Sequence, residues 1–134
     1  MLGLPQSEVD AIEYHRFAIP DRCTPASHKL VSEVCTVLED CQARGRKAAI
    51  HCRGGVGRTG TIVGCWLVQS GVAQDGKEAL AFIEREWRQV EKSKRFPRSP
   101  ETGNQEEYVR SFRRMKEKAL NALQPLPVCV ESGL

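Results

Sequence analysis

Apolar side chains recur at helical spacing in several parts of the chain, and each such stripe predicts a helix. The longest stripe covers residues 26–43, where one face carries Leu30, Val31, Val34, Val37, Leu38 and Cys41. Gly45 follows at the position where a helix C-terminus favours a left-handed residue. Residues 61–68 are apolar almost all round, which is typical of a central helix packed on several sides.

Two further helices are expected in the second half of the chain. Asp75-Gly76-Lys77-Glu78 has the pattern of a capping box, and the apolar stripe after it consists of Leu80, Ile83, Trp87 and Val90. A last helix opens near Ser99-Pro100 or Thr102-x-x-Gln105, and its apolar stripe consists of Tyr108, Phe112, Met115 and Ala119. The basic residues 91–100 between these helices are either a charged surface loop or a rim that attracts phosphorylated partners.

Strand signals are shorter than the helix signals. Residues 12–18 alternate between apolar and polar positions. Residues 47–50 are expected as a short buried strand, whose apolar run Ala48-Ala49-Ile50 leads into a glycine-rich turn. Combined with the helices, these segments predict an α/β fold with a small, mostly parallel central sheet flanked by helices. We expect a single domain over residues 1–134, with its core at about 12–121 and a tail over 122–134.

The candidate chemistry lies in residues 51–60, which read His-Cys-Arg-Gly-Gly-Val-Gly-Arg-Thr-Gly. In a strand-turn-helix unit, the glycines allow successive backbone N–H groups to point inward, and the following helix adds its positive N-terminus. The result is a cradle for a tetrahedral anion, with the sulfur of Cys52 at its floor. These surroundings favour a thiolate, and Arg58 offers a planar pair of donors that matches two phosphate oxygens.

Each position of this loop has an expected role. The oxyanion contacts are assigned to Arg53, Gly54, Gly55, Val56, Gly57 and Arg58. Thr59 can donate its hydroxyl to the sulfur, and His51 can stiffen the loop by bonding backbone groups around Cys52. No metal or other cofactor is expected, because Arg58 and the amides supply the charge stabilisation. A buried structural cysteine beside an ordinary turn would explain Cys52, but not this whole combination of residues.

This run resembles the His-Cys-x5-Arg-Ser/Thr signature of the cysteine-dependent protein tyrosine phosphatases. The resemblance extends from about Ile12 to Phe112, and the short chain is similar to the compact dual-specificity branch. It implies a three-layer phosphatase fold and a catalytic role for Cys52 as nucleophile.

The resemblance also implies a general acid and a residue that orients water. The family places an aspartate in a Pro-Asp loop about thirty residues before the cysteine, and Asp21 lies 31 residues before Cys52, in the proline-bounded residues 19–25. By itself, an aspartate after a proline is an ordinary turn residue. Gln105 falls in a stretch similar to the family's glutamine loop, where that side chain orients the hydrolytic water; the alternative role is helix capping.

Composition restricts the partners. The net charge of +3 suits an anionic substrate but is far from a nucleic-acid-binding footprint, and no apolar run reaches the roughly 20 residues of a membrane span. The spacing of the six cysteines matches no zinc pattern. Because a reactive thiolate needs a reducing compartment, we expect a cytoplasmic location.

These features predict hydrolysis of phosphotyrosine in proteins, with or without phosphoserine and phosphothreonine, through a cysteinyl-phosphate intermediate. One alternative is a phosphatase of a non-protein ester, such as a phosphoinositide or an RNA 5′ end. Val56 inside the loop, with Arg53 as its only extra cation, favours protein substrates. The other alternative is a module that binds phosphopeptides without cleaving them, and the presence of Cys52 argues against it.

Overall fold

The structure, a computed structural model, describes residues 11–115. Within this range the chain forms the helices α2 (His28–Ala43), α3 (Gly57–Gln69), α4 (Gly76–Trp87) and α5 (Gly103–Ser111), with a short 3-10 helix, η1 (Glu91–Lys94), between the last two. Ala119 and the expected tail over residues 122–134 lie outside the described residues, as does the chain before residue 11.

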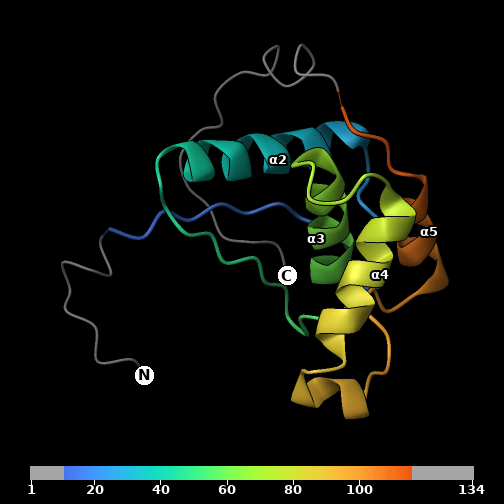
Figure 1. The fold of residues 1–134 in the computed structure, drawn as a ribbon. Helices are drawn as coiled ribbons and strands as arrows, with labels where there is room; N and C mark the ends of the chain where they lie inside the picture. Colours follow the sequence, from blue (N-terminus) through green and yellow to red (C-terminus); the bar gives the residue numbers. More distant parts are fainter. Residues whose placement is uncertain (1–10, 116–134) are drawn as a thin grey trace.

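The expected central sheet is wrong, because residues 11–115 contain no strand. Residues 12–18 and 47–50 form neither helix nor strand and contribute to the lining of one apolar cavity of about 550 Å³. A strand requires a neighbour at hydrogen-bonding distance, and an alternating pattern within one segment carries no information on such a neighbour. The described part of the fold is therefore helical, without the three layers of the expected phosphatase architecture (Figure 1).

The predicted helices are confirmed, and side-chain caps explain where α2, α4 and α5 begin. The Ser27 hydroxyl accepts a hydrogen bond from the Leu30 amide, and Gly45 adopts the expected left-handed backbone, with φ of 68°, after α2. At the start of α4, Asp75 accepts from the Glu78 amide at 2.8 Å, and Glu78 in return accepts from the Gln74 amide. Helix α5 begins with the complete capping box of Thr102 and Gln105.

Two of the expected stripes extend beyond their helices. Helix α4 ends at Trp87, so Val90 lies in the turn that follows it and is 43% exposed instead of buried. Helix α5 ends at Ser111, where Phe112 turns to extended backbone. Phe112 nevertheless remains buried, with 1% of its surface exposed, so the apolar stripe correctly identified a core position outside the helix.

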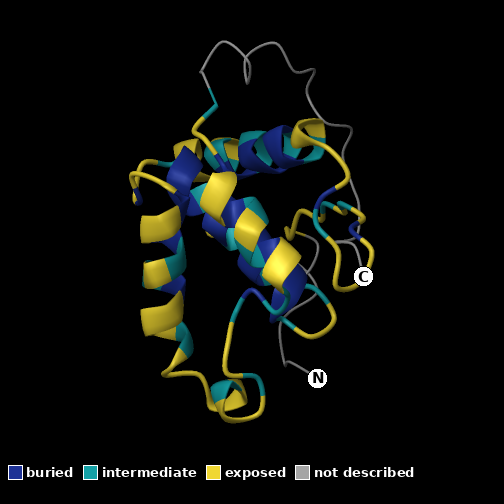
Figure 2. Ribbon diagram, turned by 90° about the vertical axis from the view of Figure 1, so that its right-hand side faces the viewer, coloured by how far each residue is buried: buried dark blue, intermediate teal, exposed yellow. Residues whose placement is uncertain are grey.

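Helix α3 is the centre of the described fold and contacts α2, α4 and α5 (Figure 1). Its buried side chains belong to two apolar clusters, one shared with α2, α4 and α5 and one shared with α2 and Ile19. Figure 2 shows buried residues along much of α3, whereas α4 keeps an exposed outer face. The loop that holds Cys52 leads directly into this packed helix, so its position is fixed by the core.

Helices α3, α4 and α5 approach one another closely at glycines. A Cβ on Gly64 would lie 2.6 Å from a methyl group of Val109, and a Cβ on Gly76 would overlap the Val109 carbonyl oxygen. Real Cβ atoms do not occur at such distances, so α3, α4 and α5 are closer here than side chains would permit. Val109 is fully buried at the point where they meet.

Candidate active site

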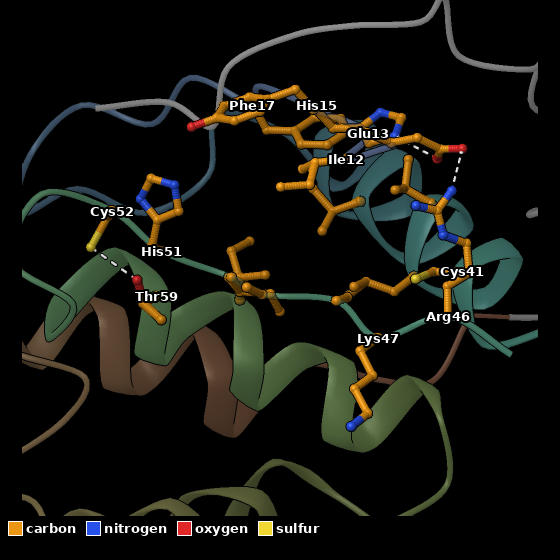
Figure 3. Close-up of a pocket in the computed structure, with 18 of the residues that line it drawn as sticks. Ile12, Glu13, His15, Phe17, Cys41, Arg46, Lys47, His51, Cys52 and Thr59 are labelled. Atoms are coloured by element: carbon orange, nitrogen blue, oxygen red, sulfur yellow. Dashed lines mark hydrogen bonds and ion pairs between the residues drawn. The ribbon is translucent and has the colours of Figure 1, made fainter. Parts of the chain in front are cut away.

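The sulfur of Cys52 is held by two hydrogen-bond donors of the glycine-rich loop. The Gly55 amide donates to Sγ at 3.1 Å, and the Thr59 hydroxyl donates to it at 3.0 Å (Figure 3). Gly55 has a φ of 74°, a left-handed backbone that favours glycine and turns its N–H toward the sulfur. Thr59 lies in the first turn of α3, so the helix N-terminus is directed at the same atom.

These contacts make Cys52 more acidic than an ordinary thiol. Partial burial of the sulfur raises the pKa, but hydrogen bonds from the Thr59 hydroxyl and from the backbone amides of Thr59 and Gly55 lower it, and so does the charge of Arg58. The net effect is a lowered pKa. A hydrogen bond to sulfur is stronger when the sulfur is an anion, so the loop stabilises a thiolate.

The other buried thiols behave in the opposite way. Burial raises the pKa of Cys35 to about 12, with a smaller contribution from Glu39 in the same direction. Burial also raises the pKa of Cys65, which lies in the core of α3. These two buried cysteines pack in the apolar core and have no thiolate character at neutral pH.

Arg58 is buried, with only 6% of its surface exposed, and its guanidinium is fixed at one edge. Its Nη1 donates to the Ile19 carbonyl at 3.2 Å, and its Nη2 lies 3.5 Å from Oδ1 of Asp21. Its Nε is buried without a hydrogen-bond partner among the described residues. A buried N–H without a partner is costly, and an oxyanion bound across Nε and Nη2 would satisfy it.

Asp21 lies at the mouth of the site and not inside it. Its side chain is 77% exposed, and it reaches the cradle through Arg58. The next residue, Arg22, has a φ of 62°, which is unusual for a residue with a side chain, and a turn follows in which the Cys23 amide donates to the Pro20 carbonyl. The structure thus brings Asp21 next to Arg58, and the role of Asp21 as general acid stays a prediction.

Gln105 is fully buried, and both ends of its amide are engaged. Its Oε1 accepts from the Thr102 amide at 3.1 Å, and its Nε2 donates to the Cys23 carbonyl at 3.1 Å. A Cβ on Gly57 would lie 2.7 Å from Oε1, so the amide also packs against the first residue of α3. Its role in orienting water stays a prediction, and its hydrogen bond to Cys23 connects it to the loop that carries Asp21.

The remaining loop residues differ in exposure. His51, Arg53 and Gly54 are exposed, whereas Val56 and Gly57 are buried at the start of α3. His51 lies beside Cys52 and Thr59 at one end of the apolar cavity, and Arg46 and Lys47 lie at the other end (Figure 3). Oxyanion binding by the loop backbone stays a prediction for these positions.

Two residues that the sequence analysis did not single out also contact the loop. The Lys92 ammonium donates to the Gly54 carbonyl at 2.5 Å, and the Ser99 hydroxyl donates to the Val56 carbonyl at 2.7 Å. Lys92 lies in the basic residues 91–100, which the sequence analysis interpreted either as a charged surface loop or as a rim that attracts phosphorylated partners. Its contact with Gly54 places at least one cation of that segment at the edge of the cradle.

Comparison with known proteins agrees with this geometry. The family model described as "PTP-SAK: Swiss Army Knife protein, DSP-PTPase phosphatase domain" matches residues 6–120. The chain belongs to this family. It is thus a phosphatase domain of the dual-specificity type, and the resemblance to cysteine-dependent protein tyrosine phosphatases is confirmed.

Two relatives cover parts of the same region. The dual specificity protein phosphatase CDC14B of Mus musculus is 37% identical over 71 residues, which make up 53% of this chain and 14% of that protein. The dual specificity protein phosphatase CDC14AB of Danio rerio is 44% identical over 46 residues, which make up 34% of this chain and 7% of that protein. The chain therefore spans a small fraction of the length of either relative.

Among the helices between residues 11 and 115, none has the length and apolar character needed to cross a bilayer.

Proposed function

We propose that the chain hydrolyses phosphate monoesters on protein side chains, phosphotyrosine and also phosphoserine or phosphothreonine, through a covalent cysteinyl phosphate. The family description and the names of the two relatives support a dual-specificity protein phosphatase. The observation that carries the proposal is the sulfur of Cys52, held by the Gly55 amide and the Thr59 hydroxyl beside a buried arginine whose Nε has no partner among the described residues.

In the first step, the Cys52 thiolate attacks phosphorus, so that an S–P bond forms while the bond from phosphorus to the side-chain oxygen breaks. The Nε and Nη2 of Arg58 bind two equatorial oxygens, and the loop amides bind the rest of the developing charge. Asp21 donates a proton to the leaving oxygen, which departs as a neutral hydroxyl. The exposed position of Asp21 suits this role, because the leaving side chain lies on the solvent side of the phosphoryl group.

In the second step, water attacks the cysteinyl phosphate, and Asp21 accepts a proton from that water. The S–P bond breaks, and the sulfur leaves as a thiolate. The Thr59 hydroxyl, already 3.0 Å from Sγ, stabilises the charge that returns to the sulfur. The covalent intermediate divides one difficult displacement into two easier ones.

The same chemistry favours a reducing compartment such as the cytoplasm. A thiolate with a lowered pKa is open to oxidation, and a solvent-accessible one is lost wherever disulfides persist. The substrate is proposed as a phosphorylated protein or peptide, and the cation at Lys92 suits acidic sequences near the phosphorylated residue.

The proposal is tested with Cys52→Ser and, as a matched control, Cys41→Ser, which changes a cysteine of α2 instead. Both proteins are assayed on tyrosine, serine and threonine phosphopeptides, on a phosphoinositide and on an RNA 5′-phosphate. Cys52→Ser should lose turnover and still bind phosphate, and acid quenching of the parent protein should trap phosphate on Cys52. Substantial turnover by Cys52→Ser, or turnover of the non-protein substrates alone, would contradict the proposal.

A further inference from the structure

The loop that carries Asp21 is tied at two points to a distant part of the chain. The Nη1 of Arg22 donates to Oε1 of Glu101 at 2.8 Å, and these residues are 79 positions apart. The Nε2 of Gln105 donates to the Cys23 carbonyl at 3.1 Å, across 82 positions. Asp21 directly precedes Arg22 and Cys23, the two residues that make these contacts, so the backbone of Asp21 is restrained on its C-terminal side.

The N-terminal side of the same loop is restrained by the cradle itself. The buried guanidinium of Arg58 donates to the Ile19 carbonyl at 3.2 Å, two positions before Asp21. The loop is therefore fixed from both directions, by Arg58 on one side and by Glu101 with Gln105 on the other. The Asp21 carboxylate is mostly exposed, and it lies 3.5 Å from Arg58, too far for a strong hydrogen bond.

The backbone of Arg22 indicates why these contacts matter. A φ of 62° is unfavourable for a residue with a side chain, and such a conformation persists only where its surroundings impose it. The bond from Arg22 to Glu101 and the bond from Gln105 to Cys23 are suited to impose it, because they hold this residue and the next. Without them, the loop would have access to more relaxed conformations in which Asp21 points elsewhere.

Gln105 is itself well anchored. Gln105 is fully buried, and its Oε1 is held by the Thr102 amide in the capping box of α5. Its amide packs on Gly57, the first residue of α3, and also donates to the Cys23 carbonyl. One side chain therefore contacts both the helix that follows the Cys52 loop and the loop that carries Asp21. The Ser99 hydroxyl attaches the same segment to the Val56 carbonyl. Residues 99–105 thus form a bridge between the loop that binds phosphate and the loop that protonates the leaving group.

We infer that Glu101 and Gln105 are positioning residues that hold Asp21 in place for proton transfer. This inference rests on the proposed role of Asp21 as general acid. Neither residue transfers a proton in this scheme: each acts on the conformation of residues 21–23. Their effect should therefore be largest where proton donation limits the rate, and small where the leaving group departs without a proton.

The test measures the first chemical step on aryl phosphates of graded leaving-group pKa, by rapid mixing. Glu101→Gln removes the charge that pairs with Arg22 and is compared with Glu107→Gln, a matched change on the exposed face of α5. We expect Glu101→Gln to slow phosphotyrosine by about tenfold and an activated aryl phosphate by about twofold or less, which is part of the roughly 10²–10⁴-fold worth of a general acid. The double variant Arg22→Glu/Glu101→Arg should recover most of the loss.

The pH profile separates a misplaced acid from a missing one. Because Glu101→Gln keeps Asp21 as the proton donor, the fall in rate on the basic side should remain while the maximal rate drops, whereas Asp21→Asn should lose that fall. Gln105→Met removes the hydrogen bond from Gln105 to the Cys23 carbonyl. Because Gln105 is buried, this variant could fail to fold, and Glu101→Gln, at a partly exposed position, then still tests the inference. A wild-type dependence on leaving-group pKa in Glu101→Gln, with an altered one in Asp21→Asn, overturns this inference alone. A wild-type dependence in both variants overturns the role of Asp21 as well.

Discussion

The hydroxyl of Thr59 lies 3.0 Å from the sulfur of Cys52, seven positions away in the sequence and on the first turn of α3. This contact joins the two chemical steps of the proposed mechanism. It stabilises the Cys52 thiolate before attack on phosphorus, and it stabilises the thiolate that leaves when the intermediate breaks down. One hydrogen bond therefore acts on the acidity of Cys52 and on its quality as a leaving group.

Replacing Thr59 with alanine should raise the pKa of Cys52. The thiolate then begins to form at higher pH, so the rate of alkylation by iodoacetamide should rise at higher pH than in the parent protein. Hydrolysis of the cysteinyl phosphate should slow by roughly tenfold or more, because a hydrogen bond to a charged group contributes about 1.5–3 kcal/mol. Thr59→Ser keeps the hydroxyl and should behave like the parent; an unchanged alkylation profile in Thr59→Ala would exclude the effect.

Arg58→Lys should be nearly as damaging as Arg58→Ala. Lysine keeps the charge but has no planar edge, and it cannot satisfy both Ile19 and a phosphate oxygen pair in the way the guanidinium does. The measurement is the affinity for inorganic phosphate or vanadate, together with kcat/KM on a phosphopeptide. Near-normal values in Arg58→Lys would mean that charge alone is sufficient at this position.

Asp21→Asn should slow phosphotyrosine hydrolysis by about 10²–10⁴-fold, the usual worth of a general acid for a poor leaving group. An activated aryl phosphate should be affected much less, because its leaving group departs without a proton. The fall in rate on the basic side of the first step should disappear, since the group that must be protonated is gone. If this limb persists in Asp21→Asn, another residue supplies the proton.

Lys92→Gln should weaken phosphate binding by a few-fold, because the Gly54 carbonyl loses a charge-assisted hydrogen bond at an exposed position. The loss of affinity should be larger for peptides with acidic residues beside the phosphorylated one than for neutral peptides, and added salt should reduce this difference. Lys94→Gln is the matched control, because Lys94 lies on the same short helix and pairs with Glu91. Equal losses in the two variants would indicate a general charge effect.

The cradle could be predicted from the sequence because its parts are neighbours in the chain. Cys52, Gly55, Arg58 and Thr59 lie within one turn and the first turn of a helix, so spacing alone brings them together. Asp21 required the resemblance to a family, because no local pattern distinguishes a catalytic aspartate from a turn residue. In the structure Asp21 lies 3.5 Å from Arg58, and its role as general acid stays a prediction.

The bridge over residues 99–105 could not be predicted in the same way. Ser99, Glu101 and Gln105 resemble ordinary helix-start residues, and Gln105 does form the capping box that its sequence indicated. Their contacts with Val56, Arg22 and Cys23 cross long stretches of chain and depend on how α5 packs against α3. The spacing of residues along α5 contains no information on those distances.

The prediction of a central sheet was wrong for a related reason. Alternation in residues 12–18 correctly indicated that Phe17 faces an apolar interior, but Ile12 is 55% exposed and Tyr14 is 51% exposed. Pairing depends on a second segment at the right distance and register, which a local pattern does not encode. Residues 47–50 contribute to the lining of the same cavity without forming a ladder with residues 12–18.

The glycine contacts around Val109 make catalysis sensitive to substitutions far from the cradle. Gly64 and Gly76 leave space for Val109, which lies one helical turn after Gln105. A methyl group at Gly76, on the first turn of α4, would displace the backbone of α5 and with it the amide that touches Gly57 and Cys23. In a survey of random mutants, loss of proton donation should therefore appear at the α4–α5 crossing as well as in the catalytic loops. An added methyl group at Gly64 would instead meet the Val109 side chain, so suppressors of a Gly64 defect should be sought in a smaller residue 109 and not in the chemistry of residue 21.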